Sequence, residues 1–198
     1  MFLAPDSKCT NIGIHMKKIA IVYFSQTNVS AELANAISEG AITEESIEVF
    51  KYRITGKEII EGRFINNKLI KDLSTCAGII FGSPTYMGGP AAQFKAFADA
   101  TSDLWCKQGW ANKIAAGFTC GSAMNGDQSS TLHYFATLAS QHGMLWVGLD
   151  TTCGLNNQGI NRFGCQLGVT AHSPDGQTHN SDLATARYLG IRVRKILN

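Results

Sequence analysis

The segment from Lys17 to Gly40 constrains the fold of this chain more than any other part of its sequence. Six consecutive apolar residues, Ile19 to Phe24, form a short run without polar alternation, which is typical of a strand buried on both faces. A helical pattern follows almost at once, for which we predict Ser30 as the N-cap and Gly40 as the C-terminal stop. The segment therefore predicts a strand, a hydroxyl-rich turn and a helix in direct succession.

The turn between this strand and this helix has the composition of an anion site. It consists of Ser25-Gln26-Thr27-Asn28-Val29-Ser30, so three hydroxyl groups stand beside the first turn of the helix. The first amide groups of a helix have no intrahelical acceptor, and the helix dipole makes this end positive. A phosphate group satisfies both features. Serine and threonine also cap helices that bind nothing, so the turn alone leaves an ordinary capping role open.

Length and composition place the chain among globular proteins. Its 198 residues suffice for one α/β domain, and 44% hydrophobic and 16% charged residues are ordinary for such a domain. The net charge of +2, without a marked basic cluster, argues against nucleic-acid binding. No apolar run approaches the roughly 20 residues of a membrane helix. We therefore expect a cytoplasmic protein with no nucleic-acid partner and no membrane span.

The amino-terminal segment and the cysteines add two expectations. Residues 1–15 are too polar for a signal peptide, and the first predicted strand begins directly after Met16. We therefore expect a disordered N-terminal extension over residues 1–15 and one domain over residues 16–198. The six cysteines form no C-x-x-C pair and have no metal-finger spacing. They indicate free thiols in a reducing compartment and no metal site.

The remainder of the chain alternates short apolar runs with helical patterns. Further strands are predicted over residues 47–54, 78–82, 114–120 and 144–149, and further helices over residues 69–76, 90–105, 132–139 and 181–197. Residues 55–67 show no clear period, and residues 150–176 are irregular and rich in asparagine and glycine. Five strands alternating with five helices predict an α/β fold, with a doubly wound five-stranded parallel sheet and helices on both faces.

The loops after the first, third and fourth predicted strands contain most of the serine, threonine, glycine and asparagine residues that interrupt the apolar runs. The carboxyl ends of parallel strands meet at one edge of the sheet, where such folds bind ligands. The chain lacks G-x-G-x-x-G after the first strand and lacks G-x-x-x-x-G-K-[ST], so the usual dinucleotide and nucleoside triphosphate sites are not expected. A site for flavin mononucleotide (FMN) fits better, with hydroxyls for the phosphate and two loops for the ring.

At this point the sequence resembles a known family. Ser25-x-Thr27-x-x-Ser30 is similar to the T/S-x-T-G-x-T phosphate loop of flavodoxins, with Asn28 where glycine is usual. Gly82-Ser83-Pro84-Thr85-Tyr86, Leu104-Trp105 and His142-Gly143-Met144 resemble one branch, the WrbA-type NAD(P)H:quinone oxidoreductases. The resemblance covers nearly the whole chain from Met16. It implies a flavodoxin-like fold with strand order 2-1-3-4-5, FMN as cofactor, NADH or NADPH as reductant, and a homodimer or homotetramer.

The loops and the resemblance together give a set of expected FMN-binding residues. These are Ser25, Gln26, Thr27, Asn28, Val29, Ser30, Pro84, Thr85, Tyr86, Met87, Gly88, Thr119, Cys120, Gly121, Ser122, Ala123, Met124, Asn125, Gly126 and His142. The first six are expected to hold the phosphate, and the others to border the isoalloxazine ring. An ordinary strand-to-helix turn is the alternative for each loop.

Three side chains have roles that stay open at this point. In the resembling family the histidine that matches His142 faces the flavin pocket, which implies a catalytic group that donates a proton or hydrogen bond to a quinone. The alternative is a helix-end histidine that interacts with terminal carbonyl groups. Trp105 is implied as a wall of the substrate pocket, contributed to a neighbouring subunit, or else packs structurally. Cys120 could pair with a histidine as a nucleophile, but a cysteine that ends an apolar strand is typically inert.

The resulting functional hypothesis is an FMN-dependent NAD(P)H:quinone oxidoreductase. A single cavity at the flavin predicts that reductant and quinone use it in turn, with two-electron hydride transfer and ping-pong kinetics. The alternative is a flavodoxin-type electron carrier without substrate turnover of its own. Such carriers are strongly acidic, whereas this chain has a net charge of +2.

Overall fold

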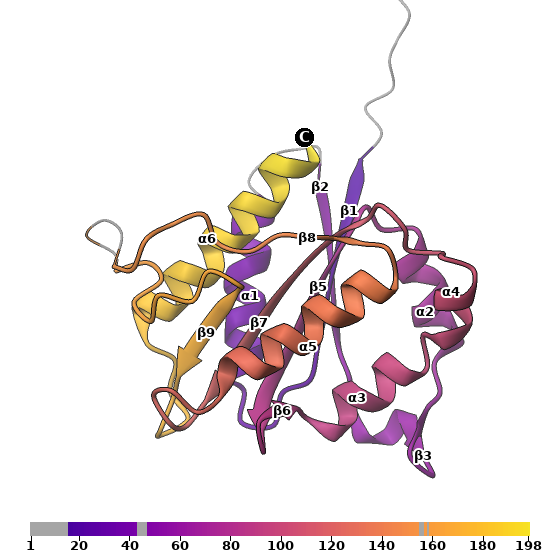
Figure 1. Ribbon diagram of the computed structural model, residues 1–198, viewed down its shortest axis with the longest axis horizontal. Coiled ribbons are helices and arrows are strands. Elements are labelled where there is room, and N and C mark those ends of the chain that lie inside the picture. The colour runs from indigo at the N-terminus through magenta and orange to yellow at the C-terminus, as the bar shows by residue number, and fades with distance from the viewer. Residues whose placement is uncertain (1–15, 43–46, 155–156, 158) are drawn as a thin grey trace, which may run out of the picture.

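The fold is a mostly parallel sheet with helices on both faces (Figure 1). A computed structural model describes residues 16–42, 47–154, 157 and 159–198, so the extension expected over residues 1–15 lies outside the described residues. The main path of the sheet runs β2-β1-β5-β7-β8 with parallel pairing throughout. The strands are β1 (Lys17–Tyr23), β2 (Ile47–Arg53), β5 (Gly78–Tyr86), β7 (Ile114–Gly121) and β8 (Leu145–Trp146). This confirms the doubly wound sheet and the predicted order 2-1-3-4-5.

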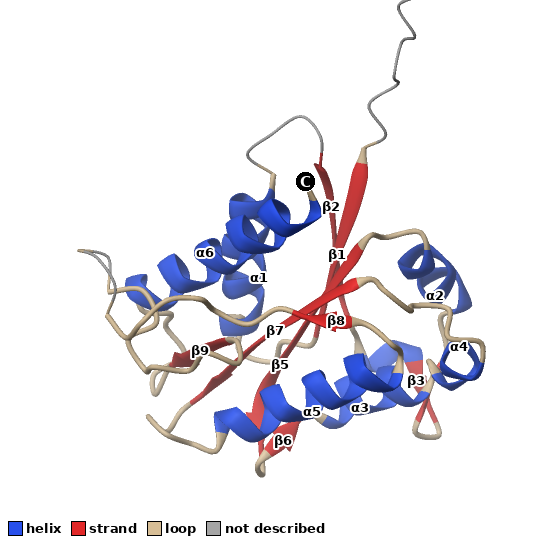
Figure 2. Cartoon of the chain, turned by 45° about the horizontal axis from the view of Figure 1, so that its top comes forward, coloured by secondary structure: helices blue, strands red, loops and turns tan. Residues whose placement is uncertain are grey.

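Strand β1 contributes to two hydrophobic cores, because successive side chains of a strand point to opposite faces. Ile19 and Ile21 belong to the core beneath α1 and α6, whereas Ala20 and Val22 belong to the core beneath α2, α3 and α5 (Figure 2). The helices are α1 (Val29–Ala41), α2 (Asn67–Ser74), α3 (Ala92–Asp99), α4 (Ser102–Cys106), α5 (Gln128–Gln141) and α6 (Asn180–Leu197). Burial on both faces explains the unbroken apolar run that predicted this strand.

Helices α1 and α6 lie side by side and approach each other through glycine. A Cβ atom on Gly40 would lie 2.0 Å from the carbonyl oxygen of Arg187, and one on Gly190 would lie 2.1 Å from that of Ile37. The prediction that Gly40 ends the helix is therefore wrong, since α1 continues to Ala41. Gly40 serves close packing of two helix backbones rather than termination.

The region after the third predicted strand also differs from expectation. Strand β5 continues to Tyr86 and pairs with β6 (Gly89–Pro90) through a two-residue turn. Met87 and Gly88 both have positive φ, 49° and 75°, as a type I′ hairpin turn requires. Pro90 thus lies in a strand, and the helix predicted over residues 90–105 is two helices, α3 and α4. They are separated near Thr101, whose hydroxyl donates to the carbonyl of Ala98 at 2.7 Å.

The fifth position of the sheet is filled by two separate segments. Strand β8 pairs with Ile114 and Ala115 of β7, and β9 (Val169–His172) pairs with Phe118 to Gly121 of the same strand. The strand predicted over residues 144–149 is therefore too long. The chain leaves the sheet after Trp146 and returns at β9, which sequence analysis placed in an irregular segment.

The remaining elements are small. Residues 55–67, which showed no clear period, contain a 3-10 turn (Gly56–Glu58) and the hairpin of β3 (Ile59–Ile60) and β4 (Arg63–Phe64). In the part of the chain that the structure describes, no helix combines the length and apolar character needed to cross a membrane. The same described residues contain no cluster of three or more histidine, cysteine or acidic side chains suited to a metal ion.

Candidate functional site

The loops after β1, β5 and β7 meet at the carboxyl edge of the sheet, as predicted. They enclose a cavity of about 230 Å³ whose lining combines residues from four loops. Its lining residues are Thr27, Val29, Pro84, Thr85, Tyr86, Cys120, Gly121, Ser122, Ser173, Pro174 and Gly176. The last three belong to the loop after β9 and were not assigned to the site from sequence. The available signal was the Pro174-Asp175-Gly176 sequence, whose residue types are typical of a turn.

The phosphate loop is organised by Asn28, which is the N-cap of α1 in place of the predicted Ser30. Asn28 has φ 78°, a left-handed conformation that asparagine tolerates better than most residues, which explains asparagine at a position where glycine is usual. The amides of Ala31 and Glu32 donate to the Asn28 carbonyl at 2.9 and 3.0 Å. The two preceding helical amides, of Val29 and Ser30, have no acceptor within the helix and remain available to an anion.

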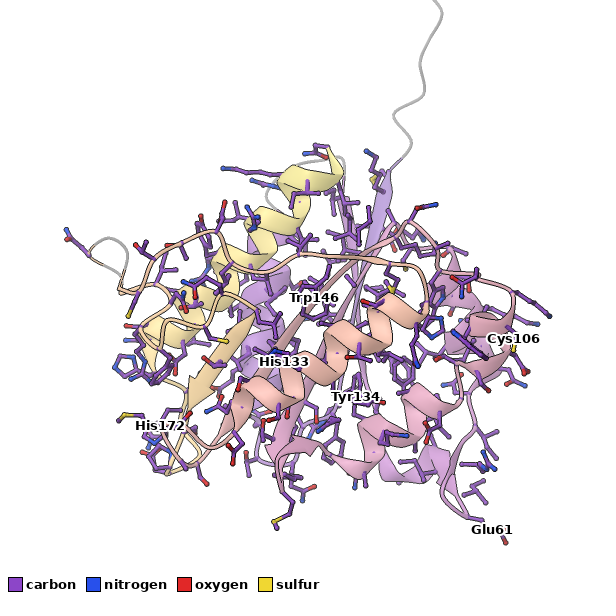
Figure 3. All side chains as sticks on the ribbon, viewed as in Figure 1. Glu61, Cys106, His133, Tyr134, Trp146 and His172 are labelled. Atoms are coloured by element: carbon purple, nitrogen blue, oxygen red, sulfur yellow. The ribbon has the colours of Figure 1, made fainter. Side chains whose placement is uncertain are left out.

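Ser30 contacts a buried thiol instead of capping the helix. Its Oγ lies 3.3 Å from Sγ of Cys120, and both residues are buried. Burial raises the pKa of the Cys120 thiol, and the contact with Ser30 opposes this only in part. His133 lies exposed on α5, with Nδ1 2.8 Å from the Ser129 carbonyl oxygen (Figure 3). The geometry therefore favours an inert Cys120, because its thiol is buried and contacts Ser30 whereas His133 lies on the exposed face of α5.

Among the described residues, three buried hydroxyl groups at this edge have no hydrogen-bond partner. They are Oγ of Ser25, in the phosphate loop, and Oγ of Ser173 and Oγ1 of Thr178, in the loop after β9; Thr178 lines the adjoining larger cavity. An unpaired buried hydroxyl is costly, so the Ser25 and Ser173 hydroxyls fit a polar ligand that accepts their hydrogen bonds. Together with the free amides of α1, these hydroxyls match the phosphate and sugar-like chain of FMN. The residues present therefore fit this cofactor.

The other wall of the cavity is the β5–β6 hairpin and the end of β7. Tyr86 is 45% exposed, and Met87 at the hairpin tip is fully exposed. Beneath them, the Thr85 hydroxyl lies 2.8 Å from the hydroxyls of both Thr119 and Thr131. The two latter side chains are completely buried. This linked group of three threonines holds the polar floor of the cavity in a defined position.

Several predicted residues lie beside the cavity or beyond it rather than in its lining. Met124 and Asn125 border a separate cavity of about 510 Å³, formed with residues that include Phe163 and Cys165. Gly126 has φ 37° and lies in the turn before α5. The residues of the predicted set outside the lining of the smaller cavity are Ser25, Gln26, Asn28, Ser30, Met87, Gly88, Thr119, Ala123, Met124, Asn125, Gly126 and His142.

His142 lies at the far end of α5 from the cavity at the carboxyl edge, so it does not line that cavity in its own chain. Helix α5 starts at the carboxyl edge and runs 14 residues, about 20 Å, before His142 caps its end. The imidazole is 1% exposed, its Nε2 lies 2.8 Å from the Thr101 hydroxyl, and its ring packs on Trp110 at 4.5 Å. Burial lowers the pKa of His142. Trp105, 47% exposed, borders a cavity of about 380 Å³ together with His142.

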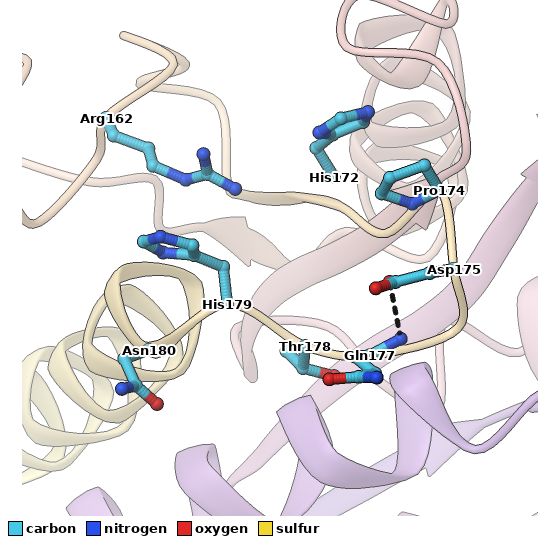
Figure 4. A pocket seen from close by; sticks show the side chains of 8 residues that line it. All are labelled: Arg162, His172, Pro174, Asp175, Gln177, Thr178, His179 and Asn180. Carbon is cyan, nitrogen blue, oxygen red and sulfur yellow. Dashed lines mark hydrogen bonds between the residues drawn. The ribbon is translucent and has the colours of Figure 1, made fainter.

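A second, larger cavity adjoins the predicted flavin site. It has a volume of about 520 Å³ and shares Pro174 with the smaller cavity (Figure 4). Arg162, His172 and His179 contribute basic side chains to its lining. Arg162 is held by two hydrogen bonds to the buried carboxylate of Asp182, at 2.6 and 2.8 Å, which also raise the pKa of Arg162. This cavity is therefore rich in hydrogen-bond donors with a fixed cation on one side.

Comparisons with known proteins agree with this geometry. A sequence profile described as NADPH-dependent FMN reductase matches residues 29–152. The chain is 36% identical over 189 residues to Flavodoxin FldP of Pseudomonas aeruginosa, covering 91% of this chain and 97% of that protein. It is 28% identical over 193 residues to a protein of Syntrophus aciditrophicus named NAD(P)H dehydrogenase (quinone), covering 89% and 95%.

A solved structure is similar over the same extent. The crystal structure of a flavodoxin, WrbA-like protein from Agrobacterium tumefaciens matches with a TM-score of 0.69 and 34% identity, covering 91% of this chain and 96% of that chain. The long coverage, the identity and the phosphate loop all agree with one assignment. The chain belongs to the NADPH-dependent FMN reductase family, as a WrbA-like flavoprotein of the oxidoreductase class with a flavodoxin-like fold.

Proposed function

We propose that this protein reduces quinones, or similar two-electron acceptors, with NADH or NADPH. The supporting observation is the pair of adjoining cavities, about 230 and 520 Å³, that share Pro174. The smaller suits the flavin, and the larger leaves room beside it for the rest of a nicotinamide nucleotide. An electron carrier that only docks to proteins needs no such second cavity. The net charge of +2 also fits a small-molecule enzyme better than an acidic carrier.

Each wall of the smaller cavity has a distinct task in this proposal. The amides of Val29 and Ser30 and the Ser25 hydroxyl hold the phosphate of FMN. The hairpin around Met87 borders the ring, where backbone amides favour negative charge on the reduced cofactor. Bound FMN supplies the redox chemistry, because it takes a hydride from a reduced nicotinamide and delivers two electrons to an acceptor. The Thr119 and Thr131 hydroxyls fix the Thr85 hydroxyl, which can form a hydrogen bond to the flavin at the floor of the smaller cavity.

Initial-rate kinetics test this proposal. The reductant and the quinone would occupy the same open place in turn, so the first product leaves before the second substrate binds. Purified protein loaded with FMN is assayed with NADH or NADPH and benzoquinone, each varied against the other. Parallel double-reciprocal lines are expected. Intersecting lines would contradict the shared cavity, and no turnover with either reductant would contradict the function.

A flavodoxin-type carrier is the second candidate, since a relative at 36% identity is named Flavodoxin FldP. A carrier would be reduced only through a protein partner. Stopped-flow mixing of the FMN-loaded protein with NADH and NADPH separates the two candidates. Rapid bleaching of the flavin absorbance supports the enzyme. A flavin that stays oxidised with both nucleotides, but is reduced by a flavodoxin reductase, supports the carrier.

We also propose self-association, as a homodimer or homotetramer. Trp105 is nearly half exposed at the amino edge of the sheet, far from the flavin site of its own chain. It can therefore border a substrate only in a site shared with a neighbouring subunit. Light scattering after gel filtration tests this, and a monomer at assay concentration would remove Trp105 from the substrate site. The predicted cytoplasmic location stays a prediction.

A further inference from the structure

Arg53 reaches from the end of β2 to the phosphate loop that follows β1. It is the last residue of β2 and stands in register with Tyr23, the last residue of β1. Its Nη2 donates a hydrogen bond of 2.7 Å to the Ser25 carbonyl oxygen. None of the acidic side chains in the described part of the chain forms an ion pair with it. The guanidinium thus brings an unneutralised positive charge to the loop.

This hydrogen bond also determines how the start of the loop is oriented. The peptide bond between Ser25 and Gln26 is trans, so the Gln26 amide points away from the carbonyl that Arg53 holds. Fixing the carbonyl therefore fixes the amide on the other side of the same plane. Ser25 itself is 97% buried, and its Oγ has no partner. Arg53 is consequently in direct contact with the residue whose free hydroxyl marks the anion site.

We propose that Arg53 positions the phosphate loop for the phosphate of FMN through its hydrogen bond to the Ser25 carbonyl, and that its positive charge favours the phosphate bound by that loop. This inference rests on the FMN site, but not on quinone turnover. One hydrogen bond uses only part of the planar guanidinium, which has five donors suited to phosphate oxygens. A phosphate monoester carries close to two negative charges at pH 7. Helix dipoles and hydroxyls alone leave most of that charge uncompensated.

A comparison of FMN with riboflavin isolates this role, because riboflavin lacks the phosphate. Flavin-free protein is titrated with each flavin, and the quenching of flavin fluorescence gives the dissociation constants. Arg53→Met should weaken FMN binding by about 10- to 100-fold, the range for losing a hydrogen bond to a charged group. Riboflavin binding should stay within about twofold. Arg53→Lys keeps the charge but loses the planar fork of the guanidinium, so its dissociation constant for FMN should lie between those of the wild type and Arg53→Met.

Two further measurements distinguish the loss of the Arg53 charge from a general loss of structure in the variant. Arg63→Met removes an exposed arginine from the β3–β4 hairpin and should change neither dissociation constant. Raising the salt concentration should weaken FMN binding to the wild type more than to Arg53→Met, since salt screens the interaction that the variant lacks. Equal losses of FMN and riboflavin in Arg53→Met, or no loss of FMN, would overturn the inference. Normal phosphate discrimination without quinone turnover would instead refute only the proposed function.

Discussion

Replacing Gly190 with alanine should destabilise this protein by forcing α1 and α6 apart. The new Cβ atom would lie 2.1 Å from the Ile37 carbonyl oxygen and 3.0 Å from the Ala41 amide nitrogen. Both neighbours are helix backbone, which cannot rotate away as a side chain can. The helices must therefore separate by about 1 Å to restore ordinary contact, and the packing between them opens with them.

The cost of that separation follows from what fills the interface. Leu33, Ile37, Leu189 and Val193 are fully buried in the core beneath these two helices. Burial of such a side chain is worth about 2–3 kcal/mol, and a gap of about 1 Å forfeits up to half of the contact energy. The interface should lose about 3–4 kcal/mol. Alanine favours a helix over glycine by about 1 kcal/mol, which leaves a net loss of about 2–3 kcal/mol.

Urea unfolding followed by circular dichroism measures this loss as a lower midpoint with an unchanged slope. Gly40→Ala creates the matching clash from the other helix, 2.0 Å from the Arg187 carbonyl oxygen. The double variant should cost less than the sum, because one separation makes room for both methyl groups. Gly56→Ala is the control, with no atom within 4 Å of its new Cβ. A midpoint for Gly190→Ala equal to that of the control would refute the reasoning.

Three other predictions concern single side chains. Burial lowers the pKa of His142 from its ordinary value of 6.5. Below about pH 6.5 the unfolded chain therefore binds more protons than the folded chain. The free energy of unfolding should fall between pH 7 and pH 5, by at most about 1.4 kcal/mol per pH unit. His142→Gln should flatten that slope in urea titrations, and an unchanged slope would contradict it. Arg162→Met leaves the 1% exposed carboxylate of Asp182 without its cation and should cost about 3–5 kcal/mol by urea unfolding, a cost that Arg162→Met combined with Asp182→Leu should largely remove. Asn28→Gly should keep FMN affinity in fluorescence titrations, whereas Asn28→Val should weaken it because φ 78° strains a β-branched residue; equal affinities would be contrary to this account.

Sequence reasoning identified the sheet well because its central strands are buried on both faces. Ile19 to Phe24 form a run that only a doubly covered strand explains, and Gly78 to Phe81 and Ile114 to Cys120 repeat the pattern. Strand β9 was missed because its alternation of apolar and polar residues extends over only four positions, Val169 to His172, within an irregular segment. Its position depends on pairing with Phe118 to Gly121, more than 40 residues earlier. Pairing partners of this kind are not visible in a local pattern.

The site shows the same division between local and long-range information. The composition of the turn from Ser25 to Ser30 suggested an anion site, although it left an ordinary capping role open. Ser173 lines the same cavity as that turn, and Arg53 donates a hydrogen bond to the Ser25 carbonyl; both come from distant segments, and neither stands in a sequence pattern that marks it. The place of His142 at the end of α5, which was the alternative to a pocket residue, follows from the direction of the chain. It precedes a parallel strand, and the start of such a strand lies at the edge opposite the ligand site.

The interruption between β8 and β9 has a consequence for how this enzyme family can vary. The short strand nearest the amino edge and the one that leads into the Ser173 loop are each fastened to β7 by their own ladder. The ladders of β8 and β9 therefore fix the register of the Ser173 loop independently of the length of the segment that joins the two strands. A change of length in the exposed part of this segment should therefore leave the pairing of β8 and β9 with β7 unchanged.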